Sequence, residues 1–506
     1  MAGTASPERL RLQKGFSCSG RLTWRATPRS LGAVTSRPNI LFVMADDHAA
    51  HAISAYDSRI NRTPGIDRIA VEGMRLDACF CTNSLCSPSR AAILTGTYNH
   101  VNGVTSNSPD FDARQPTFVR LLQDAGYQTS IVGKWHLGHG GIHDPVGFDR
   151  WSVLPDHGRY HDPEFLEPGG RTVLRPGYTT DVITDVALEW LADRDRSRPF
   201  CTLVQHKAPH RAWEPAARHA ALYADDEIAE PPTLRDDYAG RAAPAREATM
   251  RVADDLAVED LKAFLPDEIV GDAALRWRYQ RFIKDYLRCV AALDENVARL
   301  LDFLDADGSA VSTLVVYTSD QGFFLGDHGW YDKRWMYEES LRMPMLVRYP
   351  DGIAPGSTSS DIVLNVDFGP TFLDLAGLPV PEFMQGRSFL PILRGEPPAD
   401  WRTSMYYRYW VHWDVAHHVW AHYGVRTARH KLVYYYAEPC GQAGAHDEPR
   451  TPAWELFDLE NDPRELRSVY DDPAYAGVRA GLTDELERLQ EELGDTDCAP
   501  LRDAQR

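Results

Sequence analysis

Four short runs of apolar residues form the most regular pattern in the chain. They lie at 39–45 (NILFVMA), near 129–133 (TSIVG), at 200–205 (FCTLVQ) and at 312–319 (STLVVYTS). Runs of this length without polar alternation are typical of strands that are buried on both faces of a parallel sheet. Amphipathic segments such as QPTFVRLLQDAG and DVITDVALEWLADR lie between them and predict helices. The alternation predicts an α/β fold with a central, mostly parallel sheet flanked by helices.

The rest of the chain divides where its composition changes. Residues 211–275 are rich in Ala, Asp, Glu and Pro, which predicts an insertion or lid. The segment that follows predicts a long amphipathic helix, which ends at Gly308. The segment PILRGEPPADWR is interpreted as a linker, and aromatic, alternating segments beyond it predict an antiparallel sheet. We therefore expect a disordered basic tail at 1–36, a catalytic domain at 37–395 and a smaller C-terminal α+β subdomain at 396–506.

The overall charge narrows the classes of partner. The 506 residues carry a formal net charge of −19, which argues against non-specific binding to nucleic acid or to an anionic membrane surface. No run approaches the ~20 apolar residues of a membrane span. The first 36 residues lack the apolar segment of a secretory signal. A cytoplasmic location is therefore the default expectation, with export left open.

The cysteines raise one specific question. Eight cysteines in 506 residues do not make a disulfide-dense protein, and most are expected to be small, buried apolar residues. Cys79 and Cys81 are too close together for a zinc knuckle, and no second pair follows at ligand spacing. Cys86 differs, because it stands where the stretch CSPSRAAILTG changes from loop-like to helix-like. It can be a core thiol, a metal ligand or a nucleophile.

Polar residues follow each of the four apolar runs. In chain order they are Asp46 and Asp47, Lys134 and His136, His206, Lys207 and His210, and Asp320 and Gln321. Ligand sites of parallel α/β sheets lie beyond the carboxyl ends of the strands. We therefore expect four separate strands to bring these side chains to one edge of the sheet.

The acidic members of this set predict a metal site. For Asp46 and Asp47 alone, a solvated turn that caps a helix would be the simpler interpretation. Asp320 and Gln321 make it less convincing, because three carboxylates and one amide oxygen are hard ligands. We expect Ca²⁺, which accepts irregular oxygen shells, with Mg²⁺ as the alternative.

The basic members predict an anion site. Arg90, Lys134, His136, His210 and Lys333 are expected to surround a tetrahedral anion, although each alone has an ordinary structural explanation. An anion held by lysines, histidines and a divalent metal suggests hydrolysis of a sulfate or phosphate ester.

These motifs resemble those of the type I, formylglycine-dependent sulfatases of the alkaline phosphatase superfamily. CSPSRAAILTG is similar to the Cys-x-Pro-x-Arg maturation signature with its downstream Thr-Gly, and GKWHLG to the second signature. RPNILFVMADD, KAPH, TSDQG and DKRWMYEESLRMPMLVRYP are similar to the flanking blocks. The likeness runs from about Arg37 to the C-terminal region. It implies an alkaline-phosphatase-like sandwich and a sulfuric ester hydrolase.

The resemblance also implies that a formylglycine-generating enzyme oxidises Cys86 to Cα-formylglycine, which hydrates to a geminal diol. A thiol is a soft ligand for a hard metal, whereas a diol supplies oxygens. One hydroxyl can bind the metal and attack sulfur as an activated nucleophile, and the other can later expel sulfate.

Each matched residue then has an implied role. The metal ligands are Asp46, Asp47, Cys86 as formylglycine, Asp320 and Gln321. Arg90 steadies the formylglycine, Lys134 and Lys333 hold sulfate oxygens, His136 takes a proton from the diol, and His210 protonates the leaving alcohol. The last metal position is often Asn in this family, so Gln321 places the same ligand atom one methylene further out.

The substrate is expected to be a sulfated saccharide. The block DQGFFLGDHGWYDKRWMYEESLRMP looks most like that of carbohydrate sulfatases. Aromatic residues of the C-terminal region either line a sugar pocket or pack the predicted sheet, namely Trp410, Trp413, His417, His418, Trp420 and His422. The alternatives are a phosphonate monoester or phosphodiester hydrolase of the same superfamily, and a non-catalytic binder of sulfated glycan.

Overall fold

A ten-stranded mixed sheet lies at the centre of the computed structural model, which describes residues 37–108, 110–496, 498–499 and 501. The tail predicted at 1–36 lies outside the described residues. The four apolar runs form neighbouring parallel strands in the order β9, β1, β8, β4. Their bounds are β1 (Asn39–Ala45), β4 (Gln128–Lys134), β8 (Phe200–Gln205) and β9 (Thr313–Ser319). The predicted α/β class is confirmed.

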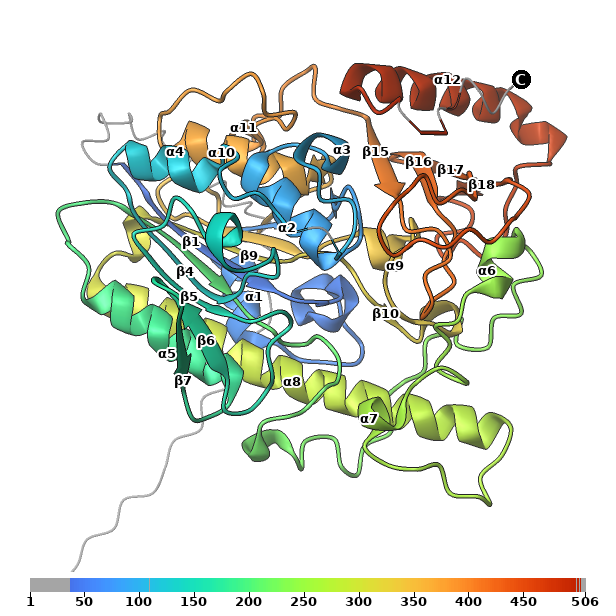
Figure 1. Cartoon of the computed structure of the whole chain (residues 1–506), viewed down its shortest axis with the longest axis horizontal. Coiled ribbons are helices and arrows are strands. Elements are labelled where there is room, and N and C mark those ends of the chain that lie inside the picture. Colours follow the sequence, from blue (N-terminus) through green and yellow to red (C-terminus); the bar gives the residue numbers. More distant parts are fainter. Residues whose placement is uncertain (1–36, 109, 497, 500, 502–506) are drawn as a thin grey trace, which may run out of the picture. The chain divides into compact units, whose positions relative to one another are not determined.

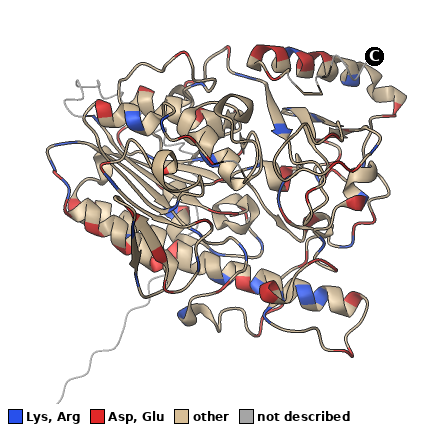
Figure 2. Cartoon of the chain, in the orientation of Figure 1, with Lys and Arg blue, Asp and Glu red and all other residues tan. Residues whose placement is uncertain are grey.

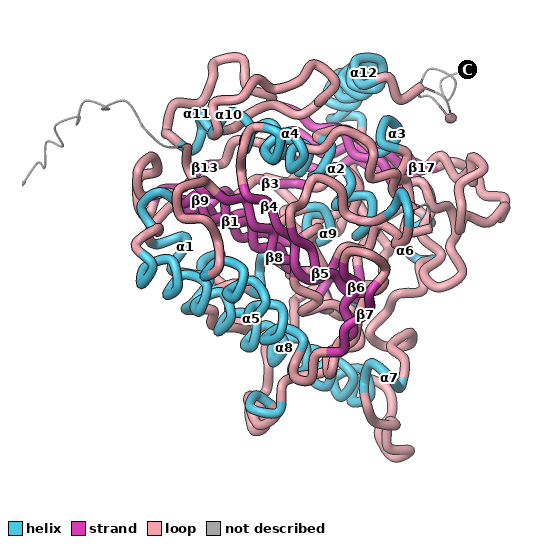
Figure 3. The backbone as a smooth tube through the Cα atoms, turned by 60° about the vertical axis from the view of Figure 1, so that its left-hand side comes forward, coloured by secondary structure: helices cyan, strands magenta, loops and turns pink. Residues whose placement is uncertain are grey.

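Both faces of the sheet are buried, and β1 shows how its sequence achieves this. Ile40, Phe42 and Met44 belong to one hydrophobic cluster, and Leu41, Val43 and Ala45 belong to another. Successive side chains of a strand point to opposite faces, so an uninterrupted apolar run fills two cores at once. Figures 1 and 3 show the helices that cover these faces. One face packs on α1 (Pro64–Val71), α5 (Thr179–Ala192) and α8 (Asp272–Asp307), and the other on α2 (Cys86–Thr95), α4 (Phe118–Asp124) and α10 (Phe368–Leu375).

Strands outside the central four make the sheet mixed. β5 (Arg150–Leu154) continues the parallel pairing next to β4, whereas β12 (Met345–Arg348) is antiparallel to β9. The outer strands are β2 (Met74–Leu76), β6 (Glu164–Glu167), β7 (Arg171–Leu174) and β13 (Ser357–Ser359). The short remaining elements are α3 (Asn99–Asn102), α9 (Glu338–Leu341), α11 (Leu390–Leu393) and the paired strands β3 (Cys79–Phe80), β14 (Val363–Leu364), β10 (Phe324–Leu325) and β11 (Tyr331–Asp332).

The C-terminal region contains the predicted antiparallel sheet. Its four strands pair in chain order and are followed by α12 (Ala476–Leu493), a helix with many acidic residues (Figure 2). They are β15 (Ser404–Tyr409), β16 (His422–Thr427), β17 (His430–Tyr435) and β18 (Ala453–Asp458). The described residues from Arg37 onward form one compact unit, so a domain boundary at 395 stays a prediction.

The segment 211–275, predicted as an insertion or lid, packs firmly against the rest of the chain. It forms α6 (Ala243–Glu247) and α7 (Val258–Leu261). Trp213 is fully buried, and the Tyr238 ring stacks on Trp330 with the centroids 5.4 Å apart. The long helix predicted after it is α8, and Gly308 caps its end in the left-handed conformation, as expected.

The cysteines follow the expectation with one exception. Cys79, Cys81, Cys201 and Cys289 are free and buried, as predicted for small apolar residues, and Cys86 is also free and buried. Cys440 and Cys498 form a disulfide that the sequence analysis did not foresee. Such bonds are usual in oxidising compartments, and the disulfide is therefore unexpected for a cytoplasmic protein. The cytoplasmic location stays a prediction. Among the described residues, no helix combines the length and apolar composition needed to span a membrane.

Gly133 provides a test of how closely β4 and β8 pack beside the strand ends. Its φ is +100°, and an added Cβ would overlap the backbone carbonyl of Gln205. We expect Gly133→Ala to lower the free energy of unfolding by about 2–3 kcal/mol in urea denaturation. The control is Gly481→Ala on the exposed side of α12, where nothing lies within 4 Å and alanine should add about 0.5–1 kcal/mol. Equal unfolding midpoints for the two variants would contradict this packing.

Candidate active site

The polar residues that follow the central strands meet at one edge of the sheet. Parallel pairing sets Ala45 opposite Ser319 and Met44 opposite Gln205, so the residues that follow start at the same level. The Asp320 amide then donates to the Ala45 carbonyl at 3.3 Å. Eight of the predicted site residues are almost completely buried there, namely Asp46, Asp47, Cys86, Arg90, Lys134, Asp320, Gln321 and Lys333. The structure thus brings together residues that lie nearly 300 positions apart.

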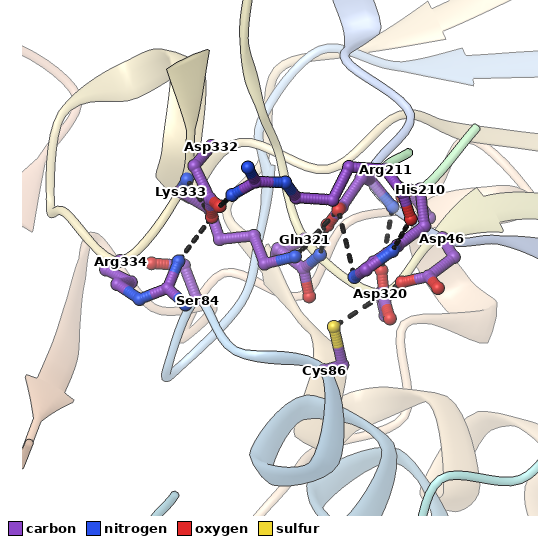
Figure 4. A network of polar contacts seen from close by, with 12 residues as sticks. Asp46, Ser84, Cys86, His210, Arg211, Asp320, Gln321, Asp332, Lys333 and Arg334 are labelled. Atoms are coloured by element: carbon purple, nitrogen blue, oxygen red, sulfur yellow. Dashed lines mark hydrogen bonds and ion pairs between the residues drawn. The ribbon is translucent and has the colours of Figure 1, made fainter. Parts of the chain in front are cut away.

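Cys86 is the first residue of α2, and its sulfur points toward the carboxylates (Figure 4). Leu85 caps the helix in an extended conformation, so a strand-like approach turns into a helix at the cysteine. The Cys86 Sγ lies 3.4 Å from Asp46 Oδ1, and the residue is fully buried. Burial, reinforced by the negative charge of Asp46, raises the pKa of this thiol far above its ordinary value. An unmodified Cys86 is therefore a poor nucleophile, because the reactive form is the thiolate.

Three buried carboxylates form the centre of the site. Oxygens of Asp46, Asp47 and Asp320 all lie within 4.8 Å of one another. Burial raises the pKa of Asp47 to about 7, with Asp46 and Asp320 adding to the effect and Lys333 opposing it. Burial and Asp46 also raise the pKa of Asp320. Burial alone would raise the pKa of Asp46 too, but the charges of Lys134 and Arg90 hold it well below its ordinary value. At two of the three carboxylates the effect of burial therefore outweighs that of the neighbouring positive charges.

These donors suit a hard divalent cation. The Gln321 Nε2 donates to Asp47, which leaves Gln321 Oε1 buried and without a hydrogen-bond partner in the part of the chain that the structure describes. Carboxylate and amide oxygens are the ligands that Ca²⁺ and Mg²⁺ prefer, and like-charged carboxylates at this spacing need a cation between them. The predicted set of Asp46, Asp47, Asp320 and Gln321 is thus assembled as a candidate metal site.

Three basic side chains partly neutralise the carboxylates. The Lys333 Nζ lies 2.5 and 2.7 Å from the two oxygens of Asp47, and Lys134 contacts Asp46. Arg90 donates to Asp320 Oδ2 from Nε at 3.1 Å and from Nη2 at 2.9 Å. Arg90 Nη2 also lies 3.9 Å from Asp46 Oδ1, and the expected role of Arg90 at the modified cysteine stays a prediction.

The two predicted histidines follow different strands, His136 after β4 and His210 after β8. The His210 Nδ1 donates to the Arg211 carbonyl at 2.7 Å, so Nε2 faces the site, 3.7 Å from Asp47 Oδ2. His136 is partly exposed and is fixed through its backbone, because Ser87 Oγ donates to its carbonyl at 2.7 Å. Burial lowers the pKa of both imidazoles well below the ordinary value, and Lys134 adds to the effect at His136.

Sequence reasoning missed other side chains at this site. His157 Nδ1 lies 3.1 Å from Lys134 Nζ. Asp332 and Arg334, which flank the predicted Lys333, form an ion pair, and Arg211 lies 3.7 Å from Asp332 (Figure 4). Arg211, Asp332 and Arg334 form a charged rim, and their sequence signal was adjacency, since each stands beside a residue that had been predicted. No such signal indicated His157.

The aromatic residues of the C-terminal region, for which a sugar pocket and sheet packing were the alternatives, divide into two groups. Trp410, Trp420 and His422 are buried, and the His422 ring stacks on Trp335 at 5.8 Å between centroids. These three side chains pack the C-terminal sheet, which is the alternative that the sequence analysis had left open. Of the others, His417 lies 3.4 Å from Asp332 at the rim, while Trp413 and His418 are partly exposed and stack on each other.

Comparison with known proteins identifies relatives along nearly the whole chain. A family model described as Sulfatase matches residues 38–378, and one described as N-sulphoglucosamine sulphohydrolase, C-terminal, matches residues 326–492. An N-acetylglucosamine-6-O-sulfatase of Bacteroides thetaiotaomicron is 43% identical over 508 aligned positions, which cover 92% of this chain and 88% of the relative. Human N-acetylglucosamine-6-sulfatase is 30% identical and covers 78% of this chain and 72% of its own length.

Solved structures agree with these matches. One protein solved in complex with its substrate, D-glucosamine-2-N,6-O-disulfate, superposes with a TM-score of 0.86 at 42% identity over 92% of this chain and 99% of that chain. A phosphonate monoester hydrolase of Agrobacterium radiobacter superposes with a TM-score of 0.71 at 21% identity, over 90% of this chain and 96% of its own. At that identity the second likeness shows a shared fold alone.

The raised pKa of Asp47 predicts how cation binding depends on pH. A proton on Asp47 competes with the cation, so Ca²⁺ affinity should rise as the pH increases toward the pKa of about 7 and level off above it. We expect a gain of up to about tenfold per pH unit below the pKa, measured by calorimetric titration between about pH 5.5 and pH 8. Asp47→Asn is the control, since it should bind Ca²⁺ more weakly and without this pH dependence. A wild-type affinity that is independent of pH would contradict the assignment.

Proposed function

We propose that this chain, which belongs to the sulfatase family and hydrolyses sulfuric esters, removes the 6-O-sulfate of a glucosamine-type sugar. The observation that carries the sugar assignment is the close superposition on a protein solved with D-glucosamine-2-N,6-O-disulfate. The bacterial and human relatives are likewise described as acting on the 6-sulfate of N-acetylglucosamine. The charged rim of Arg211, Asp332, Arg334 and His417 supports it, because such groups can hydrogen-bond sugar hydroxyls beside the sulfate site.

The nucleophile is proposed to be Cα-formylglycine, made from Cys86 by a formylglycine-generating enzyme. Support comes from the thiol of Cys86, which is buried beside Asp46. The pKa of this thiol is raised, so the unmodified side chain is a poor nucleophile. When present, the hydrated aldehyde would supply an oxygen nucleophile at the first turn of α2. The amino end of that helix favours negative charge, so it would also stabilise the sulfate.

The metal is proposed to be Ca²⁺, with Mg²⁺ as the alternative. Asp46, Asp47, Asp320 and Gln321 would hold it, and their oxygen donors and the raised pKa of Asp47 support this choice. A bound divalent cation would lower the pKa of the nucleophile and withdraw charge from the ester. Arg90 would keep Asp320 oriented through its two hydrogen bonds.

The remaining roles follow from the positions of the basic side chains. Lys134 and Lys333 are proposed to bind sulfate oxygens, and His136 to accept a proton from the nucleophile. His210 is proposed to protonate the leaving oxygen from Nε2, because its Nδ1 is already committed to the Arg211 carbonyl. Burial keeps the free imidazole neutral, and an anionic sulfate ester would raise its pKa on binding.

Turnover of a small substrate panel tests the proposal. The panel is N-acetylglucosamine 6-sulfate, D-glucosamine-2-N,6-O-disulfate, an aryl sulfate and a phosphodiester, assayed with protein produced alongside a formylglycine-generating enzyme. We expect the 6-O-sulfated sugars to give the highest kcat/KM. Faster turnover of the phosphodiester would establish the rival hydrolase, and sugar binding without turnover would establish a non-catalytic binder.

The general acid can be tested separately through the leaving group. A sugar alkoxide needs a proton to leave, whereas a nitrophenolate does not. We expect His210→Ala to lower kcat on the sugar sulfate by about 10²–10⁴-fold and to have a much smaller effect on 4-nitrophenyl sulfate. Equal losses on both substrates would show that His210 does not act as the acid.

A further inference from the structure

His157 lies at the same edge of the sheet although no sequence pattern indicated it. β5 pairs in parallel with β4 and sets Leu154 opposite Lys134. His157 follows three residues later, in a loop that turns back over the edge. Asp156 and Gly158 both have positive φ, and a Cβ on Gly158 would come within 2.7 Å of the Leu154 side chain. The tight turn that presents His157 therefore requires glycine at position 158.

Three neighbours hold the imidazole of His157. Its Nδ1 lies 3.1 Å from Lys134 Nζ. Its ring centroid lies 4.0 Å from that of His136, and it stacks on His210 with the centroids 4.4 Å apart and the planes 26° apart. His157 thus touches one proposed sulfate-binding lysine and both proposed proton-transfer groups.

The contact with Lys134 fixes the tautomer of His157. A lysine ammonium carries three N–H donors and no acceptor, so the nitrogen that faces it must accept. Nδ1 is therefore unprotonated, and the proton of the neutral ring is on Nε2. Burial, with the positive charge of Lys134 adding to it, lowers the pKa of His157 to about 2, so the ring is neutral around pH 7.

The ammonium of Lys134 then has two of its three donors assigned. One N–H goes to Asp46 and a second to His157. Because the three N–H bonds are tetrahedrally arranged, two fixed acceptors determine the direction of the third. With Asp46 as its sole partner, the ammonium could rotate about the Cε–Nζ bond and settle fully into that ion pair.

We propose that His157 is a positioning residue that aims the third N–H of Lys134 at a sulfate oxygen of the substrate. This inference rests on the proposed function, in which Lys134 binds the sulfate. A histidine suits the position because it supplies a neutral acceptor on Nδ1 and a flat ring that fits between His136 and His210. A cation at the same point would repel Lys134 and the protonated form of His210.

Two substitutions separate the acceptor from the ring. His157→Asn keeps an acceptor oxygen near the position of Nδ1, and His157→Phe keeps a flat ring without an acceptor. His143→Phe, which removes another histidine from the same part of the chain, is the matched control. The readout is the Kd of inorganic sulfate for the Ca²⁺-loaded protein, measured by calorimetry, together with kcat/KM on the sugar sulfate.

We expect His157→Phe to weaken sulfate binding and lower kcat/KM by about tenfold, the effect of one charge-assisted hydrogen bond. His157→Asn should stay within about threefold of wild type, and His143→Phe should leave both values unchanged. Equal losses in the Phe and Asn variants would overturn the proposal, because they would show that the ring alone matters. Unchanged sulfate binding in His157→Phe would also overturn it.

A spectroscopic readout tests the tautomer without any activity. In protein with ¹⁵N-labelled histidine, the resonance assigned to His157 by its absence from the Asn variant should show an unprotonated Nδ1 and a protonated Nε2 between about pH 6 and pH 8. A protonated Nδ1 would overturn the proposal. If the protein hydrolysed no sulfate ester, the proposed function would fail, whereas the tautomer and sulfate affinity would still decide the role of His157.

Discussion

Mutual repulsion among three buried carboxylates is the constraint on which the rest of the site depends. Asp46, Asp47 and Asp320 are fully buried with oxygens within 4.8 Å of one another. Burial disfavours each negative charge and strengthens the repulsion between them. Such a group is stable only when cations surround it, and three basic side chains reach it from separate elements of the fold. Positive neighbours outweigh burial at Asp46, where the pKa is lowered, whereas burial outweighs them at Asp47 and Asp320, where the pKa is raised.

This imbalance at Asp47 and Asp320 connects stability with function. A divalent cation would satisfy the oxygens of Asp47, Asp320 and Gln321, and the lysines that now pair with carboxylates would then have donors to offer an anion. On the proposed mechanism, the same positive charges would stabilise the carboxylates without substrate and bind the sulfate when substrate is present. Cys86 stands beside these groups as the first residue of a buried helix, where burial and the charge of Asp46 disfavour its thiolate.

The parallel core and most of the site could be predicted because their signals are local in sequence. An uninterrupted apolar run such as β1 identifies a strand buried on both faces, and the polar residues after it must lie at the carboxyl edge of the sheet. His157 could not be found in this way, since Arg150 and Ser152 interrupt the apolar pattern of β5 and its pairing with β4 exists only in the fold. The burial of Trp420 and His422 was equally hidden, because an alternating aromatic strand looks the same whether a sugar or another side chain covers it. The disulfide between Cys440 and Cys498 joins positions 58 residues apart, with no spacing motif to indicate it.

The central claim is that the thiol of Cys86 is a precursor and that the working group is an aldehyde. Mass spectrometry of the peptide that contains CSPSR, taken from protein that is actively hydrolysing a sulfate ester, tests this claim directly. The account predicts that active protein carries formylglycine at position 86, in a fraction that scales with specific activity across preparations. Full activity from protein in which every Cys86 is an unmodified thiol would contradict it.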